Sequence, residues 1–127
     1  MSPPVLLDSS FIVALEREAT ARRQGPAHRF LEGLRGRKLV ISVVSVEEIL
    51  EGSTDRDATL AALQRFTIQG LHLAHAHRCS LLQSRAARRM GENDAWLVAT
   101  AELLDADVVG DDRVAFERLG DRYLRFR

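Results

Sequence analysis

The sequence predicts an α/β fold, in which a short, mainly parallel sheet of four to five strands lies between helices on both faces. Short apolar stretches alternate along the chain with longer stretches of helical periodicity, a pattern typical of strands joined by helical crossovers. A length of 127 residues and an apolar content of 46% suit an ordinary hydrophobic core. We therefore expect residues 1–127 to form one domain, a three-layer α/β/α sandwich.

The first part of the chain predicts one strand and two helices. The apolar stretch 5–7 is a strand bounded by two prolines and two serines. Ser9 or Ser10 is expected to cap a helix that runs to about Glu18. After a polar loop, residues 26–36 have a proline near their start and a glycine at their end, the arrangement expected of a second helix.

The middle of the chain predicts two strands and two helices. Residues 38–42 form an apolar strand, and Ser45 is expected to cap the helix that follows. Glu48, three residues later, would complete a capping box, and a glycine ends this helix. Residues 55–66 have the apolar spacing of a helix, and residues 67–73 indicate a further strand.

The last third predicts two helices, two strands and a short connecting helix. Residues 75–89 are helical by periodicity, and residues 92–106 form a helix that is apolar on most sides and therefore central in the fold. Residues 107–110 are a short buried strand. A short helix is expected at 112–119 and an edge strand at 123–126.

The composition argues against several functional classes. The 18 basic and 18 acidic residues balance, so the chain lacks the overall positive field typical of many nucleic-acid-binding proteins. No stretch reaches the ~18 apolar residues of a membrane span, and no signal peptide precedes the first strand, so we expect a cytoplasmic protein with no membrane partner. Cys79 is the single cysteine and is expected to be a buried thiol.

Carboxylates stand at the boundaries of predicted elements in four places. Asp8 follows the first strand and Asp112 follows a later one. Both should lie at the same edge of a parallel sheet, where a switch in strand order leaves a functional crevice. Asp94 lies in the first turn of the apolar helix, and either Glu47 or Glu48 lies in the helix after the second strand.

Each of these acids also has a purely structural explanation. Asp8 would make a good cap for the first helix, and Asp94 would interact well with a helix dipole. Glu48 would complete the capping box, and Asp111 and Asp112 would suit a turn. The joint explanation is stronger, because a single architecture brings all four places together.

Clustered carboxylates repel one another and raise each other's pKa, so a shared site needs a cation. Oxygen ligands without His or Cys favour Mg²⁺ or Mn²⁺. The chemistry that fits is metal-assisted hydrolysis of a phosphodiester bond. The sequence has no phosphate-binding P-loop, dinucleotide-binding glycine pattern or zinc-ligand spacing that would indicate another chemistry.

Three segments carry these acids: "LLDSSFIVAL", "ISVVSVEEILEG" and "NDAWLVATAELLDADVVGDDRVAF". In order, spacing and length they resemble the PIN domain family, and in detail its VapC toxin branch. The resemblance implies a set of metal-binding, catalytic acids: Asp8, Glu48, Asp94 and Asp112. It selects Glu48 over Glu47, a choice that helix periodicity leaves open, and Asp112 over Asp111, which a slip of one residue in the alignment would exchange.

The sequence also departs from the family pattern. Ser9 and Ser10 occupy the small hydroxyl positions of the family, where they can hydrogen-bond an acid. Gly110 stands where relatives commonly have Ser or Thr, and Val114 and Ala115 stand where many relatives have a charged residue. Because of these departures, the part of the site around Asp112 has fewer polar side chains than in relatives, which puts a second metal ion in doubt.

The resemblance implies a Mg²⁺- or Mn²⁺-dependent endoribonuclease, the toxin of a toxin–antitoxin pair. Its partners would be an RNA substrate, a small antitoxin that blocks the acidic site with a basic residue, and a second copy of the chain, in a homodimer or a larger complex. All basic residues except Lys38 are arginine, whose planar fork matches phosphate. Solvated helix faces explain the individual basic clusters at least as well as RNA contact does.

Two other functions remain open at this point. One is a PIN-fold module that binds RNA or protein with weak or no catalysis, as Gly110 and Val114 suggest. The other is an unrelated phosphotransfer domain with Asp8 as nucleophile. The second is disfavoured because Ser10 stands where a second aspartate would be needed, and because Lys38 is the only lysine.

Overall fold

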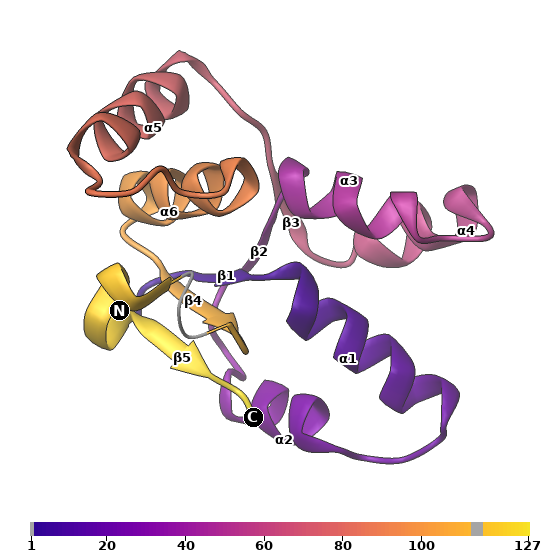
Figure 1. Cartoon of the computed structure of the whole chain (residues 1–127). Coiled ribbons are helices and arrows are strands. Elements are labelled where there is room, and N and C mark those ends of the chain that lie inside the picture. Colours follow the sequence, from indigo (N-terminus) through magenta and orange to yellow (C-terminus); the bar gives the residue numbers. More distant parts are fainter. Residues whose placement is uncertain (1, 113–115) are drawn as a thin grey trace.

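The computed structural model describes residues 2–112 and 116–127. Within these ranges, five strands form one parallel sheet. The strand order is β3-β2-β1-β4-β5, and every neighbouring pair is parallel (Figure 1). The strands are β1 (Val5–Leu7), β2 (Leu39–Ser42), β3 (Thr67–Gln69), β4 (Asp107–Gly110) and β5 (Tyr123–Arg125). The predicted parallel α/β fold is confirmed, with five strands and with β5 at the sheet edge.

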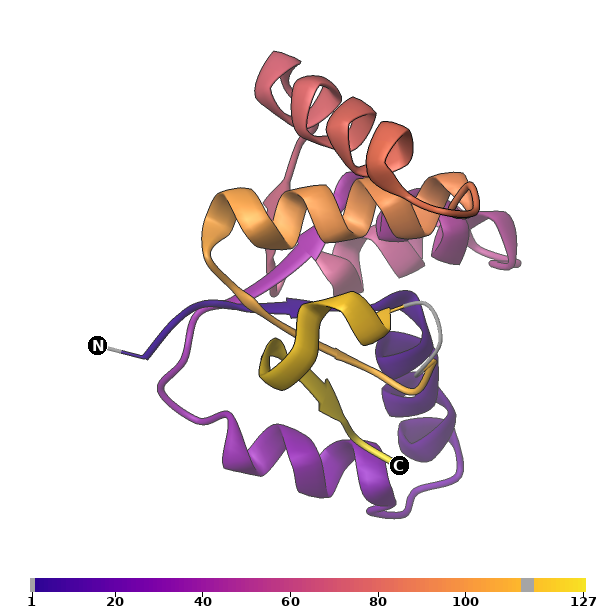
Figure 2. The same cartoon turned by 60° about the vertical axis from the view of Figure 1, so that its left-hand side comes forward.

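Helices cover both faces of this sheet, as the alternation of side chains along β1 shows. Val5 and Leu7 pack on one face with residues of α1, α2, α3 and α4, whereas Leu6 packs on the other face with residues of α6. The outer helix α5 lies on α6, where Cys79 is buried as expected (Figure 2). The helices are α1 (Ser9–Thr20), α2 (Pro26–Gly33), α3 (Val43–Glu51), α4 (Arg56–Leu63), α5 (Leu73–Arg85) and α6 (Glu92–Leu104).

Two helices start at residues other than the predicted caps. The N-cap position of α1 is Asp8, rather than either of the serines after it. Helix α3 follows β2 directly, and its cap is Ser42, whose Oγ accepts a hydrogen bond of 3.1 Å from the backbone N–H of Val44. Ser45, the predicted cap, is instead buried inside the helix. The prediction of a capping box there is wrong, because the chain turns from strand to helix three residues earlier than expected.

Helices α2, α4 and α5 end three or four residues earlier than predicted, and one further predicted helix is displaced. Helix α5 ends at Arg85, because Ala86 adopts an extended conformation with φ −74° and ψ 135°. Instead of the predicted helix at 112–119, a 3₁₀ helix, η1, spans Glu117–Arg122, and residues 113–115 lie outside the described part of the chain. In the described ranges, each helix is either too short or too polar to cross a membrane.

Candidate functional site

The candidate site lies where the strand order switches. The chain reaches β2 on one side of β1 and β4 on the other, an arrangement that leaves a crevice beyond the carboxyl ends of the strands. Asp8 follows β1, and two aspartates follow β4. Helices α3 and α6, which carry Glu48 and Asp94, contact each other beside this edge (Figure 1).

Asp8 is the most perturbed of the predicted acids. Burial raises its pKa to about 6, and the negative charges of Glu48 and Asp94 act in the same direction. Two hydrogen bonds oppose this shift. The Oγ of Ser10 donates to Oδ2 of Asp8 at 2.9 Å, and the backbone N–H of Ser9 also donates to the carboxylate. Although Asp8 occupies the N-cap position of α1, its side chain does not make the usual capping hydrogen bond, which comes from the second or third backbone N–H of a helix.

The structure separates the two neighbouring glutamates of α3. Glu48 is partly buried, and its charge acts on Asp8. Glu47 is exposed, and a hydrogen bond with the Glu51 side chain is the main cause that raises its pKa. Because Ser42 caps this helix, Glu48 lies too far along it to take part in a capping box. The structural explanation offered for Glu48 therefore fails.

The charges of Asp94 and Asp112 interact. Asp94 lies in the first turn of α6 and is half-buried. Its pKa is raised by burial and then by the charge of Asp112. A favourable interaction with the dipole of α6 remains compatible with this position. Asp112 is exposed, so the four acids range from partly buried positions, as at Asp8, to an open one at the rim.

Gly110 lies directly against Asp8. A Cβ at position 110 would stand 3.2 Å from both Cβ and Oδ2 of Asp8, closer than ordinary van der Waals contact. The backbone N–H of Asp8 donates to the carbonyl of Val109 at 2.9 Å, which fixes this approach. The glycine thus leaves room for the buried carboxylate, which gives a physical reason for the departure from Ser or Thr. The other noted departures, Val114 and Ala115, lie outside the described residues.

Two further side chains, not predicted from the sequence, lie beside the acids. Tyr123 of β5 has a buried hydroxyl with no hydrogen-bond partner among the described residues. Its pKa is raised to about 12, first by burial and then by the charges of Asp8 and the two aspartates after β4. Arg127 forms an ion pair with Asp111. Neither residue had a local sequence signal, because their positions depend on the pairing of β5 with β4.

The donor chemistry of the site fits a hard divalent cation. Carboxylate oxygens dominate, and a cation would offset the repulsion that raises the pKa of Asp8. As placed, no three acidic, His or Cys side chains within residues 2–112 and 116–127 stand close enough together to ligate one ion. Mg²⁺ tolerates such an open arrangement, since it commonly takes one or two protein carboxylates together with waters and substrate phosphate.

Comparisons with known proteins agree with this fold. A sequence model of the PIN domain matches residues 5–121. The structure is similar to a chain of a toxin–antitoxin complex from Klebsiella pneumoniae, with a TM-score of 0.75 and 21% identity over 94% of this chain and 98% of the other. It is also similar to a chain of VapBC2 from Rickettsia felis, bound to a promoter DNA fragment, with a TM-score of 0.72 and 17% identity over 95% and 96% of the two chains.

A third solved structure, VapBC-1 from nontypeable Haemophilus influenzae, gives a TM-score of 0.67 and 22% identity, and it covers 92% of each chain. A search of curated proteins found no match. At identities of 17–22%, these structural similarities support the fold of the chain and leave the chemistry to be argued from its own residues.

Proposed function

Because the chain belongs to the PIN domain family, we propose that it is a metal-dependent endoribonuclease and the toxin of a toxin–antitoxin pair. The observation that carries the proposal is the mutual electrostatic influence of acids from four separate elements. Glu48 and Asp94 both act on Asp8, and Asp112 acts on Asp94. Structural capping explains neither Asp8 nor Glu48.

We assign the four acids the role of holding Mg²⁺ or Mn²⁺ at the carboxyl ends of β1 and β4. When bound, such an ion supplies charge neutralisation and activation of water for attack on a phosphodiester. Ser10 holds the Asp8 carboxylate in one orientation through its 2.9 Å hydrogen bond. Attack by water would leave a 5′-phosphate and a 3′-hydroxyl on the RNA.

A cleavage assay with a matched pair of variants tests the nuclease proposal. The purified protein, in Mn²⁺ and in EDTA, is incubated with total RNA beside Asp94→Asn and Glu92→Gln. Both acids lie in the first turn of α6, so both variants weaken the interaction with the helix dipole. We expect Mn²⁺-dependent cleavage that falls at least about tenfold in Asp94→Asn and is unchanged in Glu92→Gln. Equal cleavage by both variants would refute the assigned role.

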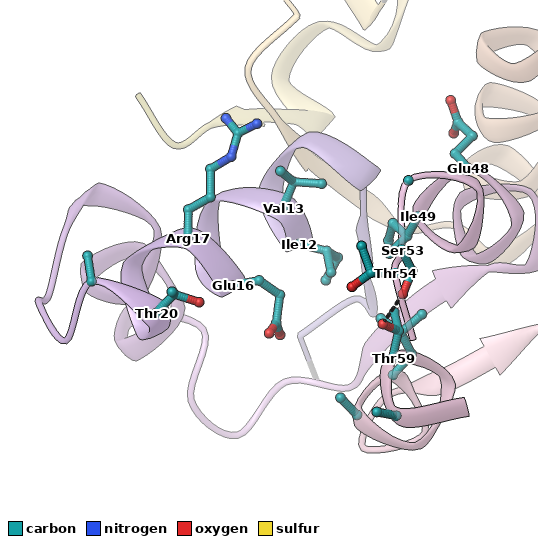
Figure 3. A pocket seen from close by; sticks show the side chains of 15 residues that line it. Ile12, Val13, Glu16, Arg17, Thr20, Glu48, Ile49, Ser53, Thr54 and Thr59 are labelled. Carbon is teal, nitrogen blue, oxygen red and sulfur yellow. Dashed lines mark hydrogen bonds between the residues drawn. The ribbon is translucent and has the colours of Figure 1, made fainter. Parts of the chain in front are cut away.

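We propose further that an antitoxin segment occupies the groove between α1, α3 and α4. This groove has a volume of about 900 Å³ and includes Glu48 among its lining residues (Figure 3). Val13 and Ile49 contribute apolar surface. Glu48 contributes a negative charge, whereas the charge of Glu16 is already paired with Arg65. A partner segment with apolar side chains and a basic residue would suit it. The Klebsiella, Rickettsia and Haemophilus proteins were solved as toxin–antitoxin or VapBC complexes.

The groove proposal is tested by co-expression with a candidate antitoxin, the small protein product of a reading frame adjacent to the gene of this chain. Ala62 and Ala61 are adjacent, exposed residues of α4, but only Ala62 lines the groove. We expect Ala62→Arg to prevent copurification of the small protein, because the new side chain fills the groove. Ala61→Arg should behave as the unmodified protein. Copurification with Ala62→Arg would exclude this groove as the docking site.

The alternative of a PIN-fold binding module without catalysis is favoured by the open spacing of the acids. In that case the RNA would stay intact in Mn²⁺, although it would still bind. The unrelated phosphotransfer domain no longer applies, since the chain matches the PIN family over residues 5–121. The homodimer remains a prediction. Sedimentation velocity would measure the oligomeric state directly.

A further inference from the structure

Arg127 lies beside the acids, two residues after the end of β5. The backbone N–H of Phe126 donates to the carbonyl of Gly110 at 3.2 Å, which extends the pairing of β5 with β4. The Phe126 ring is buried and packs edge-to-face on Phe11 at a centroid distance of 5.0 Å. The segment that leads to Arg127 is therefore fixed at the carboxyl ends of the strands, where Asp8 and Asp112 also lie.

The guanidinium of Arg127 is oriented by two contacts. Its Nε donates to Oδ2 of Asp111 at 2.9 Å, and its Nη2 lies 2.8 Å from the same oxygen. It also lies over the Phe126 ring, with Cζ 5.0 Å from the centroid. These contacts engage one edge of a fork that carries five N–H donors. With its side chain 49% exposed, the rest of the fork remains accessible to a ligand.

The position of this cation matters because of the charges around it. Asp111, its partner, is followed directly by Asp112, so the fork is tethered next to the proposed metal-binding acids. An RNA phosphate that approaches these acids meets repulsion, which a cation fixed at the rim offsets. Arg37, in one basic cluster noted in the sequence, is committed elsewhere, since it pairs with Asp107 at 2.6 Å.

We propose that Arg127 anchors a phosphate of the RNA substrate beside the acidic site, and that Asp111 is the positioning residue that holds it there. This inference rests on the proposed function for the identity of the substrate. It assigns the two consecutive aspartates different tasks: Asp112 faces the metal site, whereas Asp111 orients a cation. Arginine suits the task because its planar fork contacts carboxylate and phosphate with separate donors.

The test measures RNA binding, so that it does not depend on cleavage. A fluorescein-labelled single-stranded RNA is titrated with the Asp94→Asn protein, and fluorescence anisotropy is recorded over a range of NaCl concentrations. We expect an added Arg127→Gln to weaken binding about tenfold and to lower the slope of log K against log salt by about 0.7, the loss of one phosphate contact. An added Asp111→Asn should weaken binding less, because the cation stays but loses its orientation.

The matched control is Arg65→Gln, in the same Asp94→Asn protein. Arg65 is similarly exposed and also paired with a carboxylate, that of Glu16, but it extends from the end of α4. We expect its replacement to leave binding unchanged. Equal effects of Arg65→Gln and Arg127→Gln, unchanged binding in Arg127→Gln, or no RNA binding by the parent protein would each overturn the inference. A fall in melting temperature with unchanged binding would identify the Arg127–Asp111 pair as a purely structural tie.

The two proposals fail in different ways. If the unmodified protein does not cleave RNA in Mn²⁺ but binding depends on Arg127, the nuclease proposal fails and the phosphate anchor stands. If the protein cleaves RNA and Arg127→Gln leaves both KM and binding unchanged, the anchor fails alone. Where both hold, Arg127→Gln should raise KM about tenfold with little change in kcat, because a contact present in ground and transition states is lost.

Discussion

Replacement of Asp8 by asparagine is expected to reduce RNA cleavage at least about 100-fold while the protein stays folded. Asp8 is the acid on which the charges of Glu48 and Asp94 act together, and burial raises its pKa to about 6. Asparagine keeps its size and one oxygen acceptor but removes the negative charge that attracts a cation. Single-turnover cleavage of a labelled RNA in saturating Mn²⁺ would measure the loss.

The same variant should be more stable than the unmodified protein when metal is absent. The pKa of Asp8 is about 6 in the folded protein, above its ordinary value of 3.8. Folding therefore favours the protonated form, so this contribution to stability falls as the pH rises from about 4 to 6. Asp8→Asn should recover on the order of 1–3 kcal/mol at pH 7. A less stable variant that still cleaves RNA would show that Asp8 is a structural residue.

Glu18→Gln is expected to destabilise the protein by about 2–3 kcal/mol at neutral pH. Glu18 is only 4% exposed and ties α1 to the start of α2. Its carboxylate accepts backbone N–H bonds from Gly25, Ala27 and His28 at 2.9–3.0 Å, and Nδ1 of His28 lies 2.8 Å from Oε1. Glutamine offers a single, uncharged oxygen to this set of donors.

The pH dependence identifies the cause of that loss. Burial of Glu18 would raise its pKa, but the hydrogen bonds from His28 and Ala27 outweigh burial and lower it from 4.5 to about 2. The stabilisation is therefore complete above about pH 4.5 and is lost as the pH falls through 2. Urea unfolding should show that the difference in free energy of unfolding between Glu18→Gln and the unmodified protein becomes smaller as the pH falls from about 4.5 to 2. A difference that is constant with pH would exclude the charged hydrogen bonds as its source.

Gly25→Ala provides an independent check on the same interaction. A Cβ at position 25 would lie 2.5 Å from Cδ and Oε2 of Glu18, so it must displace the carboxylate. If both substitutions act on this contact, their combined effect should be smaller than the sum of the two separate effects. Additive effects would mean that Gly25→Ala acts elsewhere.

The sheet was predictable because its central strands are nearly continuous apolar runs, as expected where both faces are covered. The start of α3 was not, because Ser42 both ends β2 and caps the helix. A serine that plays both roles has no separate local signal. The buried Ser45, three residues on, matched the capping-box pattern, but the helix already begins at Val43, with Ser42 as its cap.

The site was predictable in part for a topological reason. Asp8 and Asp112 follow parallel strands, and parallel strands end at one edge. Periodicity could not choose between Glu47 and Glu48. The structure distinguishes them, since the charge of Glu48 acts on Asp8 while Glu47 contacts Glu51. The metal-binding and catalytic roles of the acids remain predictions.

The Arg127–Asp111 pair could not be predicted locally, because it joins residues 16 positions apart. Its formation depends on the parallel alignment of β5 beside β4, with Arg125 opposite Gly110. The edge strand itself was predicted correctly, but its register against β4 cannot be read from the sequence. The register decides which side chains at the end of that strand lie next to the acids.

The central claim is that acids from separate elements hold one divalent cation, and Mn²⁺ binding tests it most directly. Electron paramagnetic resonance counts free Mn²⁺ as the metal is titrated into the unmodified protein, Glu48→Gln and Glu47→Gln at pH 7. We predict saturable binding to the unmodified protein and to Glu47→Gln, and at least about tenfold weaker binding to Glu48→Gln. Equal Mn²⁺ binding by the two glutamine variants, or no saturable binding by the unmodified protein, would contradict the claim.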